Sequence, residues 1–256
     1  MKDPVKFHSM SDLLFSQGFG TRRICAGLVQ QGLVKVDTGG GLMLIEEDQD
    51  ITPTEGMRYE VQGVCWQYFA KAYILLHKPA GTECSHKPSV WPSVYSLLPA
   101  PLRQRPAKTG LQGVQAVGRL DQDTTGMLVL TDDGPLIHRM SSPRHHVAKV
   151  YEVTTAEPIT DKQVLRLLEG VVLDDSPKTV KAAACLAVSQ NHLRLTLTEG
   201  KYHQVKRMLL AVGNAVVGLH RSQIGAMSLP QDLAPGQWRW ITSEELQALS
   251  AKNLVT

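Results

Sequence analysis

The stretch that most constrains this chain is residues 114–134, VQAVGRLDQDTTGMLVLTDDG. The apolar run at 127–130 is typical of a strand that is buried on both faces. Residues 114–117 predict another strand before it, and Asp132-Asp133-Gly134 predicts a turn after it. Between the two strands lies a polar loop that contains Asp121. A loop fixed at both ends by core strands can hold one carboxylate rigidly, so Asp121 is a candidate functional residue.

Length and composition limit the class of protein. A chain of 256 residues is long enough for one large domain or two smaller ones. Its longest apolar run is far short of the roughly 20 residues that a membrane helix needs. The first ten residues lack the apolar core of a signal peptide, so we expect a cytoplasmic protein. The four cysteines are scattered without CxxC spacing, which favours reduced thiols over disulfides or metal ligands.

The pattern of elements predicts an α+β protein with two domains, at residues 1–66 and 67–256. Residues 9–36 predict two short helices and a strand, and the second domain mixes strands and helices without a regular βαβ repeat. We therefore expect a mainly antiparallel, mixed central sheet in residues 67–256.

Three further segments of the second domain have definite patterns. In residues 202–212, apolar side chains recur at helical spacing, and Gly213 is a typical C-terminal stop. Val180–Val188 and Leu193–Thr198 predict a pair of antiparallel strands, and His220-Arg221-Ser222 predicts a basic polar stretch after a strand. Ser243 is the expected cap of a final helix.

Charge is distributed unevenly along the chain. The formal net charge is only +3, but the first 68 residues are net acidic and the remainder is net basic. Basic residues gather around 139–149 and again at 201–207, which is compatible with a phosphate-binding face. No phosphate-loop or dinucleotide glycine pattern occurs, so nothing supports a nucleotide cofactor.

Three motifs taken together carry a specific resemblance. The strings GRLDQDTTGMLVLTDDG, SPRHHVAKVYEV and EGKYHQVKRMLLAVGN resemble, in order and spacing, the motifs of ribosomal RNA pseudouridine synthases. Among these the chain most resembles the small-subunit (16S rRNA) pseudouridine synthase A family, from about residue 72 to about residue 247. Upstream, the turn at 18–23 and the strand at 32–36 resemble the small RNA-binding module that precedes such catalytic domains.

This resemblance implies a reaction and three catalytic residues. The C1′–N1 bond of a uridine is cleaved and the base is rejoined through C5, so no cofactor and no metal are expected. Asp121 would act as nucleophile or base. A cation within about 4–6 Å would keep it ionised, and Lys206 is the candidate, with Arg207 as an alternative. Tyr151 would stack on the uracil.

Six further cations are expected to bind the substrate. The resemblance and the charge clusters point to Arg119, Arg144, Lys201, Arg207, Arg22 and Arg23. The expected partner is ribosomal RNA or a partly assembled small ribosomal subunit, and nothing demands more than a monomer. Acidic residues at 46–50 leave open whether the N-terminal module itself grips RNA.

Two alternatives remain open at this stage. The same reaction could act on a uridine of large-subunit RNA, because the catalytic motifs are shared. Alternatively, the chain could be a non-catalytic RNA-binding factor in ribosome assembly. The presence of Asp121, Tyr151 and Lys206 together argues against the second, since a protein that only binds RNA would not need that set.

Overall fold

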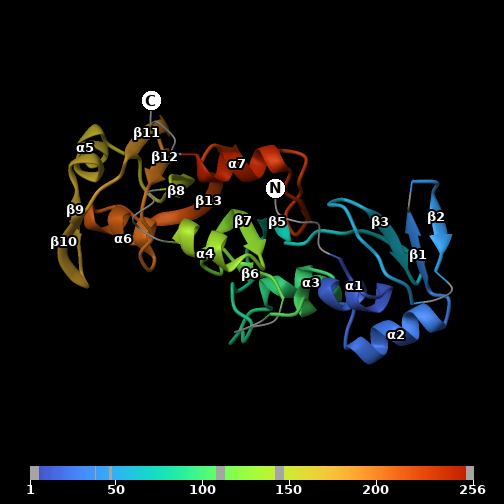
Figure 1. The fold of residues 1–256 in the computed structure, drawn as a ribbon. Helices are drawn as coiled ribbons and strands as arrows, with labels where there is room; N and C mark the ends of the chain where they lie inside the picture. The colour runs from blue at the N-terminus through green and yellow to red at the C-terminus, as the bar shows by residue number, and fades with distance from the viewer. Residues whose placement is uncertain (1–5, 38, 46–47, 108–112, 142–146, 252–256) are drawn as a thin grey trace. The chain divides into compact units, whose positions relative to one another are not determined.

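A computed structural model describes residues 6–37, 39–45, 48–107, 113–141 and 147–251. The chain divides into two compact units (Figure 1). Unit 1 comprises Met1–Ala72, Leu98–Gln115 and Thr131–Asp133, and unit 2 comprises Tyr73–Leu97, Ala116–Leu130 and Gly134–Thr256. The two units are described separately below.

Unit 1 packs short helices against a four-stranded sheet with the order β2-β1-β3-β4. Ser9 caps the first helix through its hydroxyl, which accepts a hydrogen bond from the Asp12 N–H at 3.0 Å. Thr21 caps the second helix in the same manner, through a hydrogen bond from the Ile24 N–H. The elements are α1 (Met10–Gln17), α2 (Arg22–Gln30), β1 (Val34–Asp37), β2 (Leu42–Leu44), β3 (Arg58–Val61), β4 (Val64–Gln67) and α3 (Ala100–Gln104).

The central sheet has nine strands, with the order β11-β12-β8-β13-β7-β5-β15 and with β14 and β6 paired to β13 and β7. β8 runs antiparallel to β12 and β13, whereas β13 and β7 are parallel, so the expected mixed α+β fold is confirmed. The strands are β5 (Tyr73–Lys78), β6 (Gln115–Ala116), β7 (Thr125–Thr131), β8 (Lys149–Thr155), β11 (Ala184–Ser189), β12 (His192–Leu197), β13 (Val216–Ile224), β14 (Met227–Ser228) and β15 (Trp238–Trp240).

Helices and a hairpin complete unit 2. One buried cluster lies between β8, β12 and the helices α5 and α6, and another joins β5, β7, α4 and α7. The residues of β7 from Gly126 onward are all buried, because the strand lies inside the sheet. The remaining elements are the 3-10 helix η1 (Val94–Leu97), α4 (Gly134–Ser141), α5 (Asp161–Glu169), α6 (Gln204–Ala211), α7 (Ser243–Ser250) and the hairpin of β9 (Val171–Leu173) with β10 (Ser176–Val180).

Three sequence predictions for unit 2 were wrong in detail. The strand expected over 180–188 is divided, since β10 ends at Val180 and β11 begins at Ala184. The final helix is capped by Thr242 rather than Ser243, because the Thr242 hydroxyl and the Glu245 side chain form a reciprocal capping box. His220-Arg221-Ser222 lies within β13 instead of following it, which buries Arg221 in the sheet.

Two simple features concern the whole described chain. All four cysteines are free thiols. None of the helices in the described ranges has both the length and the apolar content to cross a membrane.

Candidate active site

A buried lysine holds the backbone of the loop that carries Asp121 through hydrogen bonds. Lys78, at the end of β5, is fully buried and its Nζ donates to the carbonyls of Pro79, Gln122 and Thr124 at 3.0, 3.2 and 2.9 Å. Burial lowers the pKa of Lys78, and the nearby acidic groups, including Asp123 and Asp121, oppose that shift. These hydrogen bonds fix the backbone on either side of the loop's exposed turn, so Asp121 is held in one position.

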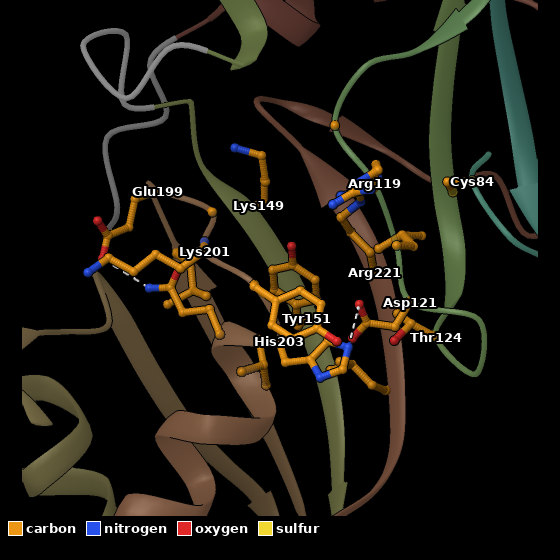
Figure 2. A pocket seen from close by; sticks show the side chains of 18 of the residues that line it. Cys84, Arg119, Asp121, Thr124, Lys149, Tyr151, Glu199, Lys201, His203 and Arg221 are labelled. Atoms are coloured by element: carbon orange, nitrogen blue, oxygen red, sulfur yellow. Dashed lines mark hydrogen bonds and ion pairs between the residues drawn. The ribbon is translucent and has the colours of Figure 1, made fainter. Parts of the chain in front are cut away.

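A lysine and a histidine at the start of α6 approach the Asp121 carboxylate. Its oxygens lie 3.4 Å from His203 Nε2 and 3.5 Å from Lys206 Nζ, and its side chain is 27% exposed. Figure 2 shows the imidazole of His203 facing Asp121. His203 is the N-cap residue of α6, and Lys206 lies three residues later in the first turn of that helix. Asp121 therefore has the Lys206 ammonium group and the His203 imidazole beside it while remaining open to the pocket.

Lys206 has a closer partner than Asp121. Its Nζ donates to both oxygens of Asp123 at 2.6 and 2.8 Å. Burial alone would raise the pKa of Asp123, but the hydrogen bond and the charge of Lys206 outweigh it and lower that pKa. Asp123 thus anchors Lys206 beside the loop.

A pocket of about 550 Å³ opens next to Asp121 in unit 2. This volume is within the usual range for small-ligand sites. Tyr151 from β8 lines it together with Lys149 from the same strand and Arg221 from β13 (Figure 2). An aromatic ring beside a carboxylate and several cations suits a planar, polar ligand that carries negative charge nearby.

Of the three carboxylates that line the pocket, two are engaged in structural hydrogen bonds. Glu83 accepts from the N–H groups of residues 89–91, and these bonds lower its pKa to about 2. Glu199 accepts from the side-chain amide of Gln204 at 3.0 Å. Within the described ranges, Asp121 contacts only His203 and Lys206 at ion-pair distance, which leaves its oxygens available for a reacting atom.

The structure brings some of the predicted substrate-binding residues to the pocket and not others. Arg119 and Lys201 line it. Arg207 instead forms ion pairs with Asp174 and Asp175 at the β9–β10 turn and does not line the pocket. Arg144 lies outside the described residues.

Arg22 and Arg23 belong to unit 1. Arg22 is ion-paired with Asp12, and its guanidinium lies 4.4 Å from the centre of the Phe15 ring. Arg23 is exposed and borders a shallow hollow on α2.

Sequence reasoning missed three residues of the site. Lys78 was not singled out as a site residue. His203 was interpreted only as a member of a motif, and Arg221 only as part of a basic stretch. His203 had a weak signal, since it lies three residues before Lys206 in the same motif. The contacts of Lys78 and Arg221 depend on segments more than forty residues away, as in Lys78 to Thr124 (46 residues) and Arg221 to Met127 (94 residues). In the described part of the chain, no group of three or more His, Cys, Asp or Glu side chains is placed to hold a metal ion.

Comparison with known proteins defines the class. Residues 72–211 match the model of the RNA pseudouridylate synthase family, and this match spans more than half of the chain. The chain belongs to the RNA pseudouridylate synthase family and is therefore an RNA pseudouridine synthase.

Particular relatives are similar over most of their length. The chain is 39% identical to ribosomal small subunit pseudouridine synthase A of Yersinia pestis, covering 80% of this chain and 83% of that protein. It is 37% identical to the Escherichia coli (strain K12) protein of the same name, covering 93% and 98%. A crystal structure of a pseudouridylate synthase matches with a TM-score of 0.65 at 31% identity, covering 95% of this chain and all of the other.

Proposed function

We propose that this enzyme isomerises a specific uridine of 16S rRNA to pseudouridine, by cleaving the C1′–N1 bond and rejoining the base through C5. The observation that carries the proposal is the position of Asp121, on a clamped loop at the pocket wall with His203 and Lys206 beside its carboxylate. Similarity to relatives named small subunit pseudouridine synthase A supports the choice of RNA.

Each catalytic residue has a role that its surroundings support. Asp121 serves as nucleophile or base toward the sugar, with Lys206 as the cation beside its carboxylate and the His203 imidazole next to it. Tyr151 stacks on the uracil, with a stabilisation of about 1–3 kcal/mol that is comparable to the cost of extruding a nucleotide. The reaction moves no electrons to or from an acceptor, so it requires no redox cofactor.

The remaining cations serve RNA binding in this proposal. Arg119 and Lys201 contact the RNA backbone at the pocket, and Arg144 and Arg207 extend that contact. Arg22 and Arg23 act from the accessory domain that we place at residues 1–66, ahead of a catalytic domain at 67–256. The partner is ribosomal RNA or a partly assembled small subunit in the cytoplasm, bound by a monomer.

Complementation of a strain that lacks the protein tests this function. Pseudouridine mapping of rRNA should show one site lost from 16S rRNA, restored by the wild type and by Asp161→Asn but not by Asp121→Asn. Asp161→Asn is a matched control, because it removes an exposed carboxylate at the start of α5 that does not line the pocket.

Each other outcome would overturn part of the proposal. Restoration by Asp121→Asn would remove Asp121 from catalysis. Loss of a site in large-subunit RNA would reassign the substrate, and no lost site in either RNA would favour a non-catalytic assembly factor.

A further inference from the structure

Arg221 is a buried cation whose hydrogen bonds are incomplete. Its side chain lies in β13, 1% of the residue is exposed, and its Nε donates to the Met127 carbonyl at 2.8 Å. Its Nη2 is buried and has no hydrogen-bond partner among the described residues. No carboxylate in those residues forms an ion pair with it. Burying such a charge without a counter-ion costs free energy, so an unpaired guanidinium nitrogen calls for an explanation.

The position of the unpaired nitrogen points to a ligand. Three buried side-chain atoms in the described residues lack a partner, namely Trp66 Nε1, Thr124 Oγ1 and Arg221 Nη2. Thr124 and Arg221 both line the pocket beside Asp121. Two buried polar groups that line one pocket and lack protein partners are expected where a bound ligand supplies the missing hydrogen bonds.

The sheet places Arg221 directly beside the proposed stacking surface. In the pairing of β13 with β8, Arg221 is opposite Tyr151, and both side chains line the pocket (Figure 2). On its other side, Gly126 of β7 packs so closely that an added Cβ would lie 2.4 Å from the Arg221 carbonyl oxygen. Arg221 therefore has little freedom to move, and a base stacked on Tyr151 would present its edge within reach of it.

Charge in this part of the pocket is positive. Lys149 lies two residues before Tyr151 and also lines the pocket. Burial and the nearby Arg221 charge lower the pKa of Lys149 to about 8. The pocket thus has Asp121 as its reactive carboxylate, and in the described ranges neither Lys149 nor Arg221 has a carboxylate ion-pair partner. These two cations favour negative charge that develops on a bound ring.

We propose that Arg221 Nη2 donates a hydrogen bond to a carbonyl oxygen of the target uracil and stabilises the charge that this ring carries during isomerisation. When the C1′–N1 bond breaks, its electron pair stays with N1 and spreads onto the ring oxygens. This holds whether Asp121 attacks C1′ or removes a sugar proton. When C5 then bonds to C1′, Asp121 leaves C1′ as a carboxylate or returns to the sugar the proton that it removed. The C5 proton is then lost to solvent and N1 gains a proton, so the ring is neutral. This proposal rests on the function proposed above.

Single-turnover release of tritium from [5-³H]uridine-labelled RNA tests it. At saturating enzyme, Arg221→Met should lower the rate constant by about 10²–10³-fold, as for loss of one donor in an oxyanion hole. The affinity for RNA should change by less than about 3-fold, because no phosphate contact is removed. Arg194→Met is the matched control: Arg194 is exposed on β12, is paired with Glu152, and should retain full rate.

Substrate analogues show which atom Arg221 contacts. RNA with 2-thiouridine or 4-thiouridine at the target replaces one ring oxygen with sulfur, a weaker acceptor. One of the two should slow the wild type, and the same replacement should cause no further loss in Arg221→Met. If Arg221→Met does not fold, Arg221→Lys serves in the same pairing, since it keeps the charge but not the guanidinium geometry.

Several results would overturn the proposal. One is an unchanged rate constant in Arg221→Met. Another is that each thio-substitution slows Arg221→Met by the same factor as it slows the wild type. A third is weaker RNA binding with a normal rate constant at saturation, which would indicate a phosphate contact instead. An inactive Asp121→Asn beside a fully active Arg221→Met would reject this role of Arg221 alone. Full activity in Asp121→Asn would reject the proposed catalytic role of Asp121 instead.

Discussion

Among the described residues, unit 1 and unit 2 each bury one arginine, and the hydrogen bonding of the two differs. Arg105 in unit 1 is 2% exposed and all three of its guanidinium nitrogens donate. Its partners are the Asp132 carboxylate at 2.7 Å, Gln17 at 2.8 Å and the Phe69 and Ala70 carbonyls at 2.8 and 3.2 Å. Arg221 has one carbonyl partner and an unpaired Nη2.

This difference separates a structural arginine from a ligand-binding one. Arg105 joins segments of unit 1 that are far apart in sequence, around residues 17, 70, 105 and 132, and each of its three guanidinium nitrogens donates in doing so. A buried arginine whose guanidinium nitrogens all have protein partners contributes to folding. An equally buried arginine with an unpaired nitrogen is available to bind a ligand. Hydrogen-bond partners therefore distinguish the two roles, although burial does not.

The largest expected effect on stability comes from replacing Arg105, and the same replacement of Arg221 is its comparison. Arg105→Met should destabilise the protein by about 3–5 kcal/mol, because Asp132 and Gln17 would be left buried without their partner. Arg221→Met should change the unfolding free energy by no more than about 1 kcal/mol, since no buried carboxylate is orphaned. Urea unfolding followed by circular dichroism measures both. Equal destabilisation by the two substitutions would contradict the distinction between a structural and a ligand-binding arginine.

A glycine with positive φ packs against the backbone of each arginine. Gly18 has φ 90°, and an added Cβ would lie 2.7 Å from the Arg105 nitrogen and still closer to the Pro101 carbonyl. Gly126 has φ 108°, with the Arg221 nitrogen at 2.7 Å. Gly18→Ala and Gly126→Ala should each cost about 2–4 kcal/mol through strain and overpacking.

The two glycine variants should differ in activity. The folded fraction of Gly18→Ala should isomerise uridine at the normal rate, while Gly126→Ala should be slower because it displaces Arg221 from Tyr151. Tritium release, normalised to the folded fraction from circular dichroism, separates them. Equal rates would show that the position of Arg221 is not critical.

The course of the backbone near these residues was predictable from the sequence, but their partners were not. Local signals placed α1, α2, β7 and α6 correctly, because capping residues and apolar periodicity act within a few residues. The buried run around Asp121 was visible for the same reason. The hydrogen bonds of Lys78, the contact of His203 with Asp121 and the burial of Arg221 depend on strand order, which one sequence does not reveal.

Arg207 illustrates the same limit from the other direction. The sequence placed it among the basic residues of α6, where contact with RNA was a reasonable expectation. Its pairing with Asp174 and Asp175 depends on the β9–β10 hairpin, which was not predicted from the sequence. A distant pair of acids therefore decides how much of its charge is available.

The lowered pKa of Lys149, a neighbour of Arg221, makes the unfolding free energy depend on pH. Its pKa is lowered to about 8 in the folded protein from an ordinary value near 10.5, by burial and by Arg221. Between these two values the unfolded chain binds more protons than the folded one, so stability rises with pH through this window. The gain from pH 7.5 to 10 should be roughly 1–3 kcal/mol, less than the full shift because Lys149 is partly exposed.

Urea unfolding of Lys149→Met isolates that contribution. This variant should lack the rise with pH and should be more stable than the wild type at pH 7.5. Arg221→Met should reduce the rise as well, because it removes one cause of the low pKa, whereas Arg194→Met should retain it. A wild-type rise that survives in Lys149→Met would assign it to other groups.

The smallest effect concerns Arg207, whose charge is paired at the surface. The side chains of Asp174 and Asp175 are 84% and 60% exposed, so solvent screens these ion pairs and they contribute little to stability. Carboxylates that are so well solvated can give way to RNA phosphates. Replacing both acids by Asn should leave stability nearly unchanged and tighten RNA binding about 2–5-fold at low salt, because the Arg207 charge is no longer shared.

Salt dependence distinguishes this exchange from a general change in charge. If Arg207 pairs with a phosphate, Arg207→Gln should lower the slope of log affinity against log salt by about 1, and the double Asn substitution should then have little effect in the Arg207→Gln background. An equal gain in affinity in both backgrounds would mean that the two acids act only through net charge. Arg207 would then be a surface counterpart of Arg105, with its partners supplied by the protein. A gain that depends on Arg207 would instead place it with Arg221, as a cation whose final partner is the RNA.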